Sequence, residues 1–164
     1  MKIDLLISVH GASNSGKSTI LRSLIDDMNG EIEKEFNLGV SVEYREDRSS
    51  NETVTVRPQN VDFVAIFTID NRIKLGIATG GDNGRIEEQN WKFLTSSNCN
   101  IIVVAGRTKG ATVEKIEKYA QDAQLFIPLF KARCKKEEDR NGQDVKFKLV
   151  LINLLKKELT DLLK

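Results

Sequence analysis

Residues 11–19 read GASNSGKST and match the pattern G-x-x-x-x-G-K-[ST]. Glycine reaches backbone conformations that other residues avoid, so the main-chain N–H groups of such a loop can converge on a phosphate. The lysine of the pattern, Lys17, reaches the outer phosphates of a bound nucleotide, and the hydroxyl of Ser18 can ligate magnesium. We therefore predict a phosphate-binding loop that contains Gly11, Ser13, Asn14, Ser15, Gly16, Lys17, Ser18 and Thr19.

The sequence on either side supplies the two elements that such a loop needs. Upstream, residues 3–9 form a short apolar run of the length of a buried strand. Downstream, apolar residues recur at helical spacing over 20–28, and Asn29-Gly30 provides a stop signal. In the order strand, loop and helix, the free N–H groups and the positive dipole end of the helix point at the anion.

The motif and its context make residues 3–28 resemble the P-loop NTPase superfamily, with residues 11–19 as the Walker A motif. Beyond residue 28 the resemblance is general, and the chain is similar to small ATP-binding proteins of unassigned role. The resemblance implies a three-layer α/β domain, a nucleoside triphosphate as ligand and Mg²⁺ as the accompanying ion. It also implies that Lys17 serves catalysis and that Ser18 holds the metal.

Composition and length are those of a single soluble domain over residues 1–164, with a hydrophobic fraction of 40% and a charged fraction of 30%. A formal net charge of +1 supplies no bulk attraction for nucleic acid. We expect no membrane segment, because no apolar run approaches about 18 residues, and no signal peptide, because the first strand starts at once. Cys99 and Cys134 lack metal-site spacing, so two free thiols and a cytoplasmic location are expected.

Strand and helix patterns alternate along the rest of the chain. Polar–apolar alternation predicts strands near 40–44 and 54–56, joined by a solvated loop. Two apolar runs, 61–69 and 73–78, flank Asp70-Asn71-Arg72 and predict a tight antiparallel hairpin. The later elements that we expect are a helix over 85–94, a strand over 101–105, a helix capped by Thr112, a strand over 125–130, a solvated loop over 131–144 and a C-terminal helix. Together they predict a mostly parallel three-layer α/β sheet with an added antiparallel hairpin.

Two aspartates compete for the role of the acidic group that holds the magnesium ion or its waters. Ligands of a parallel α/β sheet lie at the carboxyl ends of its strands. If residues 73–78 run parallel to the first strand, Asp82 reaches the phosphate side and Asp70 lies at the opposite edge. If residues 61–69 are the parallel strand instead, Asp70 takes the role. We favour Asp82, with a turn or helix-cap residue as the alternative reading of either aspartate.

Other charged residues are candidates for the same edge. The sequence GRTKG follows the strand expected at 101–105, so Arg107 or Lys109 could neutralise charge in phosphoryl transfer, or could belong to a solvated basic loop. Glu87 and Glu88 could orient a water molecule, although a solvated helix face is favoured for both. A phosphate acceptor could meet arginines near the first predicted hairpin, namely Arg45, Arg48 and Arg57.

Comparison among branches of the superfamily narrows the choice of nucleotide. The order of elements is similar to that of a G domain, but the guanine signature N-K-x-D is absent and residues 29–39 contain no threonine. Small-molecule kinases of the superfamily have similar lengths and an Arg-bearing lid, for which residues 107–124 leave no separate room. The charged segment 131–144 could act as a displaced lid. ATP is therefore the default nucleotide, and GTP is not excluded.

The sequence thus predicts a Mg²⁺-dependent ATP-binding protein that hydrolyses the terminal phosphate. A small-molecule or nucleotide kinase is the first alternative, in which an acceptor receives the phosphoryl group. A switch whose protein partner reads the nucleotide state is the second. Slow hydrolysis that an acceptor accelerates would indicate the first alternative, and a partner that binds only one nucleotide state would indicate the second.

Overall fold

The computed structural model of the chain describes residues 3–12, 15–47, 52–81, 83–134 and 136–164. Within these residues the protein is α/β. The strands are β1 (Ile3–His10), β2 (Val40–Glu46), β3 (Phe63–Ile69), β4 (Ile73–Ala78), β5 (Ile101–Gly106) and β6 (Ala123–Phe130). The helices are α1 (Lys17–Phe36), α2 (Gly84–Ser96), α3 (Ala111–Ala120) and α4 (Glu137–Leu162). None of these helices combines the length and the apolar character that a bilayer span requires.

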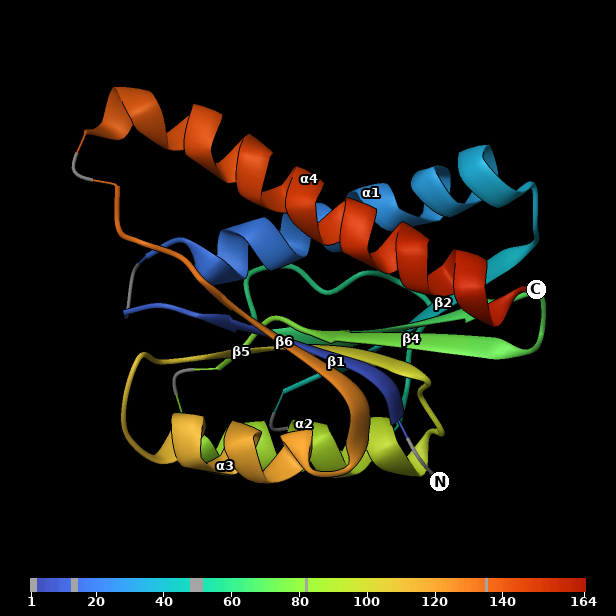
Figure 1. Ribbon diagram of the computed structural model, residues 1–164, viewed down its shortest axis with the longest axis horizontal. Coiled ribbons are helices and arrows are strands. Elements are labelled where there is room, and N and C mark those ends of the chain that lie inside the picture. The colour runs from blue at the N-terminus through green and yellow to red at the C-terminus, as the bar shows by residue number, and fades with distance from the viewer. Residues whose placement is uncertain (1–2, 13–14, 48–51, 82, 135) are drawn as a thin grey trace.

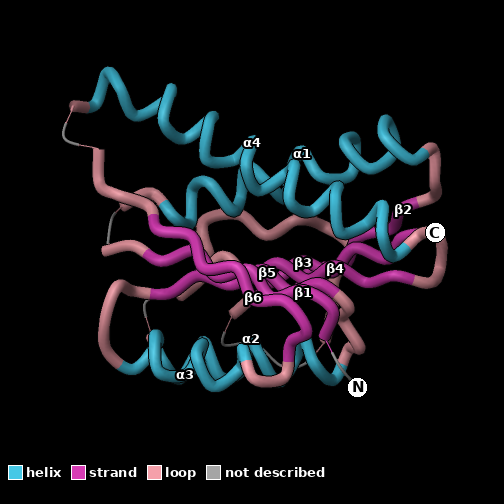
Figure 2. The backbone as a smooth tube through the Cα atoms, in the orientation of Figure 1, coloured by secondary structure: helices cyan, strands magenta, loops and turns pink. Residues whose placement is uncertain are grey.

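The strands form one sheet in the order β2-β3-β4-β5-β1-β6 (Figure 1). Strand β1 pairs in parallel with β5 on one side and with β6 on the other. Strand β4 continues the parallel part beyond β5, and β3 runs antiparallel to both of its neighbours. Helices α1 and α4 cover one face of the sheet, and α2 and α3 cover the other (Figure 2). The expected three-layer α/β architecture, with a mostly parallel sheet and an antiparallel hairpin, is confirmed.

The hairpin between β3 and β4 fixes which strand ends meet. Ile69 pairs with Ile73 across the turn, and both Asp70 and Asn71 adopt positive φ angles, of 53° and 54°. Asp and Asn tolerate this left-handed region better than most residues. Since β4 is parallel to β1 through β5, the carboxyl end of β4 lies at the same edge of the sheet as the glycine-rich loop. The expected direction of residues 73–78 is therefore confirmed.

The first predicted hairpin is wrong. Strand β2 pairs along its whole length with β3, and residues 54–56 form no strand. Val54 makes only an isolated antiparallel bridge to Tyr44. Residues 63–69 pair with β2 in place of residues 54–56 because they are more apolar and bury their side chains, whereas Val54 and Val56 remain exposed.

Two helix boundaries also differ from prediction. Helix α1 passes through Asn29-Gly30 and ends at Phe36, because the buried Ile32 extends its apolar face by a further turn. Residues 137–144, expected in a loop, are the first turns of α4, and acidic residues in the first turn stabilise a helix N-terminus. Thr112 does not cap α3; its hydroxyl accepts a hydrogen bond from the backbone N–H of Arg107 at 2.9 Å.

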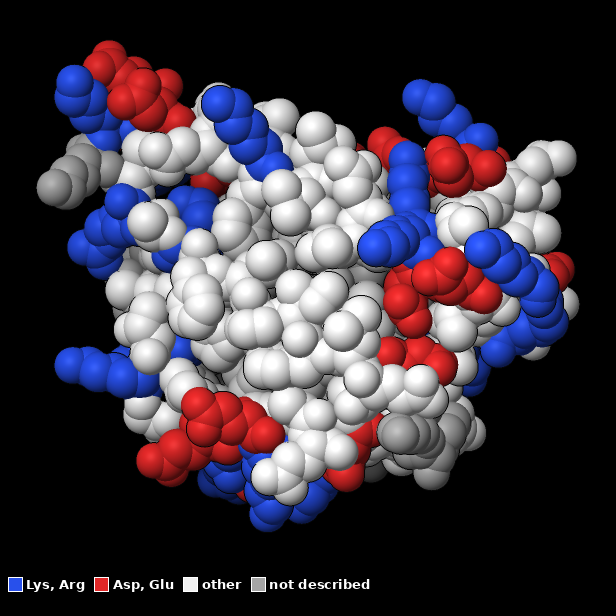
Figure 3. Space-filling model, viewed as in Figure 1, with Lys and Arg blue, Asp and Glu red and all other residues white. Residues whose placement is uncertain are grey.

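Strand β6 is an edge strand that stays partly open to solvent. Leu125 and Phe130 are 47% and 69% exposed. Uncharged side chains fill the middle of the face on which β6 and α4 lie, and charged side chains gather toward its rim (Figure 3). Pro128 within β6 has no N–H group to donate, which disfavours pairing of this edge with a further strand.

Candidate functional site

The glycine-rich loop joins the carboxyl end of β1 to the first turn of α1. Gly16 precedes the helix with a φ of 94°, a left-handed conformation that favours glycine. Helix α1 is 20 residues long, and its first N–H groups and positive dipole end face the loop. The predicted arrangement of strand, loop and helix is therefore present. Ser13 and Asn14 lie outside the described residues, so their phosphate contacts stay predictions.

Lys17 is held at this edge by backbone oxygens. Its side chain is buried, and Nζ donates to the carbonyl oxygens of Gly11 at 2.7 Å and of Gly106 at 3.0 Å. These two oxygens belong to the loop itself and to the end of β5. The ammonium is thus placed beside the loop.

A cavity of about 390 Å³ lies over the loop. Small-molecule sites begin at about 300 Å³, so a polyphosphate group is of a suitable size. The hydroxyl of Ser15 is buried there without a hydrogen-bond partner among the described residues, and an unpaired buried group of this kind calls for a ligand or a water. The described residues that line the cavity are Ser15, Gly16, Lys17, Ser18, Thr19, Asp62, Thr79, Gly80, Gly81, Ala105, Arg140 and Asp144.

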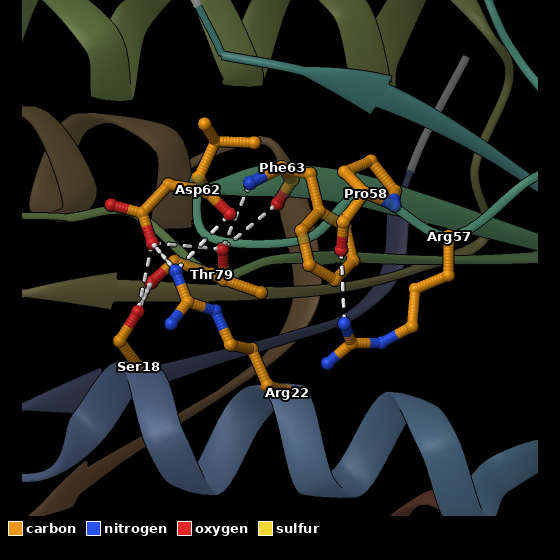
Figure 4. A network of polar contacts seen from close by, with 8 residues as sticks. Ser18, Arg22, Arg57, Pro58, Asp62, Phe63 and Thr79 are labelled. Atoms are coloured by element: carbon orange, nitrogen blue, oxygen red, sulfur yellow. Dashed lines mark hydrogen bonds and ion pairs between the residues drawn. The ribbon is translucent and has the colours of Figure 1, made fainter.

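Asp62 is the carboxylate that meets the hydroxyl of Ser18 (Figure 4). Ser18 Oγ donates to Oδ1 of Asp62 at 2.8 Å, and it also lies 3.1 Å from the carbonyl oxygen of Thr79. The same Oδ1 accepts from the hydroxyl of Thr79 at 3.1 Å and pairs with the guanidinium of Arg22 at 3.0 Å. The predicted metal-binding hydroxyl therefore has an acidic group directly beside it.

Sequence reasoning missed Asp62 because it stands inside the almost wholly apolar run 61–69. The pairing register of the β3–β4 hairpin predicts its position. Ile69 pairs with Ile73 and Val64 with Ala78, so position 62, two residues before Val64, falls beside the residues that follow β4. An antiparallel strand begins at the edge where its neighbour ends, and Asp62 reaches the edge of the glycine-rich loop from the amino end of β3.

The two aspartates considered from sequence have different outcomes. Asp70 lies in the turn at the opposite edge of the sheet, where Oδ2 accepts from Arg72 at 3.1 Å. The alternative in which Asp70 serves the metal is therefore wrong, because it required β3 to be the parallel strand. Asp82, between Gly81 and Asn83 in the sequence, lies outside the described residues. Its role as metal partner stays a prediction.

Two glycines after β4 let other groups come close to the backbone. A Cβ atom on Gly81 would lie 2.2 Å from the carbonyl oxygen of Ala105, so a side chain there would collide with the backbone at the end of β5. A Cβ atom on Gly80 would lie 2.6 Å from Oδ2 of Asp47 and 3.2 Å from Cβ of Asp62. Gly80 thus allows two carboxylate-bearing side chains to pack on one short segment.

Arg107 and Lys109 follow β5 at the edge of the glycine-rich loop, and both are exposed. Neither is among the described residues that line the cavity, and their role in charge neutralisation stays a prediction. Arg140 of α4, which sequence reasoning did not single out, does line the cavity. Asp144, one turn further along α4, also lines it and pairs with Lys131 at 3.3 Å. Two residues of the segment considered as a displaced lid, Arg140 and Asp144, therefore line the cavity.

A group of buried polar side chains lies on the other face of the sheet, under α2. Glu87 is fully buried, and neither carboxylate oxygen has a hydrogen-bond partner among the described residues. Burial raises the pKa of Glu87 well above its ordinary value, Asp47 adds to this rise, and Lys17 opposes it. The solvated face favoured for Glu87 is therefore wrong. Glu88 faces outward and pairs with Lys115 at 2.9 Å, as expected for a solvated helix face.

Arg45 belongs to the same buried group. Its guanidinium donates to Oδ1 of Asn90 at 2.8 Å and lies 4.5 Å from the ring centroid of Phe93, a cation–π contact. Arg57 pairs with Asp26 at 2.6 Å on the opposite side of the sheet. Neither arginine lines the cavity over the glycine-rich loop, and Arg48 lies outside the described residues.

Protein-family models, curated proteins and solved structures were each compared with the chain, and none of them matches. The geometry of the edge formed by the glycine-rich loop, Asp62 and the segment after β4 therefore carries the functional argument. That edge combines a buried ammonium, a helix N-terminus and a hydroxyl–carboxylate pair around one cavity.

Proposed function

We propose that the protein binds a nucleoside triphosphate with Mg²⁺, with ATP as the nucleotide, and cleaves the terminal phosphate. The observation that supports this best is the meeting of Lys17, Ser18 and Asp62 at one cavity over a glycine-rich loop. The ammonium and the helix N-terminus suit phosphate oxygens. The hydroxyl and the carboxylate suit a hard cation.

The oxygen donors fit magnesium. Mg²⁺ usually takes one or two protein ligands and completes its shell with water and phosphate oxygens. Ser18 would hold the ion, and Asp62, whose Oδ1 lies 2.8 Å from the hydroxyl, would hold the ion or its waters. Within the described part of the chain no three His, Cys, Asp or Glu side chains gather to form an all-protein cage. When bound, the ion would neutralise charge that develops on the phosphates.

The chain's own groups would divide the remaining work. Backbone N–H groups at the start of α1 would cradle the phosphates, and Lys17 would leave the carbonyl oxygens of Gly11 and Gly106 to contact the outermost ones. The predicted contributions of Arg107 or Lys109 would come from the loop after β5, and Arg140 would add positive charge from α4. A water molecule that attacks the terminal phosphorus would complete hydrolysis.

The test compares two aspartate-to-asparagine variants at opposite edges of the sheet. We expect Asp62→Asn to weaken Mg²⁺ activation of phosphate release from ATP by about 10–100-fold, the usual effect of losing a group that orients a metal ligand. Asp70→Asn, a matched control in the far turn, should leave Mg²⁺ activation unchanged. Mg²⁺ titrations of phosphate release, with ATP and GTP in parallel, measure both. Equal effects of the two substitutions would contradict the proposed site.

A further inference from the structure

A second cavity, of about 360 Å³, shares a wall with the cavity over the glycine-rich loop, which is called the phosphate cavity below. Both cavities are lined by Asp62, Gly80 and Gly81, so the two spaces adjoin at these residues. The second cavity extends away from the glycine-rich loop toward β2 and the first turn of α2. Its other described lining residues are Asp47, Val61, Asn83 and Ile86.

The lining of the second cavity is acidic. Asp47 and Asp62 both border it, and the described residues that line it include no lysine or arginine. The backbone N–H of Asp47 donates to the carbonyl oxygen of Asp62 at 2.9 Å, which ties the end of β2 to the start of β3. The two carboxylates thus come from adjoining chain segments that are held in fixed relation. Such a lining repels phosphate and attracts hydroxyl or ammonium groups.

Helix α2 turns a polar face toward this part of the molecule. Asn83 and Ile86 line the cavity, and Glu87 and Asn90 follow at the helical spacings that share their face. Glu87 is fully buried, and neither of its oxygens has a hydrogen-bond partner among the described residues. The charges of Asp47, which lines the second cavity, and of Lys17, which lines the first, both act on it. Glu87 itself lines neither cavity, so the contact with a ligand in the second cavity falls to Asp47, Asn83 and Ile86.

We propose that the second cavity binds a small hydroxyl-bearing acceptor without a phosphate group, neutral or cationic, which receives the terminal phosphoryl group of the nucleotide. This inference rests on the proposed nucleoside triphosphate site and names its second substrate. The shared wall is the reason: an acceptor hydroxyl at Asp62 and Gly80 would adjoin the phosphates bound beside Lys17 and Ser18. Water serves as the acceptor only when the cavity holds no such molecule.

The transfer step balances without any further reactant. The acceptor hydroxyl oxygen forms a bond to the terminal phosphorus, and the bond from that phosphorus to the bridging oxygen breaks. The electron pair of the broken bond stays on the nucleoside diphosphate. The hydroxyl proton passes to the carboxylate of Asp47 and from there to water, so the products are a phosphate ester, a nucleoside diphosphate and one proton.

Two of the three arginines that sequence analysis offered to a phosphorylated acceptor, Arg45 and Arg57, are engaged elsewhere, and Arg48 lies outside the described residues. Arg45 packs on Phe93 and donates to Asn90, and Arg57 pairs with Asp26. These contacts favour an acceptor without phosphate over a nucleoside monophosphate.

The experiment follows labelled phosphate from γ-labelled ATP with four probes: ribose, myo-inositol, ethanolamine and AMP. We expect at least one of the three hydroxyl probes to raise ADP formation by about 100-fold or more, with the label in an organic phosphate, because a positioned hydroxyl replaces a diffusing water. Ile86→Trp, which fills the second cavity, should abolish this stimulation and leave ATP affinity unchanged. Gln89→Trp, on the exposed side of α2, is the matched control and should keep both.

Three results would overturn the inference: label that passes to AMP, no stimulation by any hydroxyl probe, or stimulation that survives Ile86→Trp. Each of these can occur while ATP still binds and phosphate is still released slowly, which would leave the proposed nucleotide site intact. Failure of the unmodified protein to bind ATP at all would instead contradict the proposed function itself.

Discussion

The two helical layers bury the same sheet in different ways. On one face, every buried residue of α1 beyond Lys17, and every buried residue of α4, is aliphatic or methionine. On the other face, the buried residues of α2 and α3 include Glu87, Asn90 and Thr112. Asn90 and Thr112 accept hydrogen bonds from Arg45 and Arg107, whereas Glu87 has no partner among the described residues. An unpaired buried carboxyl costs stability, so the α2/α3 layer carries one fully buried side chain that stability alone would not select.

The largest expected effect is a loss of stability in the α1/α4 layer. Leu155 of α4 is fully buried in the apolar core, so Leu155→Ala should lower the free energy of unfolding by about 2–5 kcal/mol. Leu149→Ala, on the exposed side of α4, should change it by less than about 0.5 kcal/mol. Urea unfolding at neutral pH measures both. Similar losses for the two variants would show that α4 is not anchored as described.

Glu87→Met tests the opposite layer. Replacing a buried, unpaired carboxyl by an apolar side chain of similar length should raise the free energy of unfolding at neutral pH by about 1–3 kcal/mol. Glu88→Met is the neighbouring control, and it should give no gain because Glu88 is paired with Lys115 on the surface. Urea unfolding reads both variants. A large loss of stability in Glu87→Met would break the comparison, since Glu87 would then be a structural residue.

The pH dependence of stability gives a finer test of Glu87. Burial, with Asp47 adding and Lys17 opposing, raises its folded-state pKa above the unfolded value, which is about 4.3. The folded protein therefore holds this proton to higher pH, and its contribution to stability is present below about pH 4.3 and is lost as pH rises through the folded-state pKa.

We expect Glu87→Gln to remove that decline, which for one group is at most about 1.4 kcal/mol per pH unit. Urea unfolding of both proteins at about pH 5 and about pH 7 measures it, and the advantage of Glu87→Gln should grow with pH. Parallel pH profiles for the two proteins would mean that Glu87 ionises normally in the folded state.

The smallest expected effect concerns Tyr119. Its ring stacks on Trp91 with centroids 4.2 Å apart, and its buried hydroxyl has no hydrogen-bond partner among the described residues. Tyr119→Phe keeps the stacked ring and removes only the unpaired group, so stability should stay equal or rise by up to about 1 kcal/mol. A thermal unfolding scan detects this change, and a clear loss of stability would show that the hydroxyl is satisfied.

Local chemistry made one part of the fold predictable. The glycine-rich loop, its flanking strand and helix, and the turn at Asp70-Asn71-Arg72 depend on neighbours in sequence, and all of them are present. Strand β2 pairs with β3 and not with residues 54–56. This choice depends on how well two separate segments pack against β2, and the polar–apolar periodicity of each segment does not predict which of them pairs better.

The candidate site divides in the same way. The positions of Lys17 and Ser18 follow from the motif, whereas the position of Asp62 follows only when the hairpin register is extended by one residue before the start of β3. Glu87 carried a signal as well, because it shares a helix face with Trp91 and Leu94, both buried. Its burial was missed because the adjacent Glu88 makes the pair resemble an ordinary charged surface.

The central claim is that Lys17 and the glycine-rich loop hold the phosphates of a nucleoside triphosphate. Isothermal titration of Mg²⁺–ATP into the unmodified protein and into Lys17→Ala tests it most directly, with phosphate release followed in the same samples. We expect tight binding and release by the unmodified protein, and loss of both in Lys17→Ala. Equal affinity and equal release in the two proteins, or no binding by either, would contradict the claim.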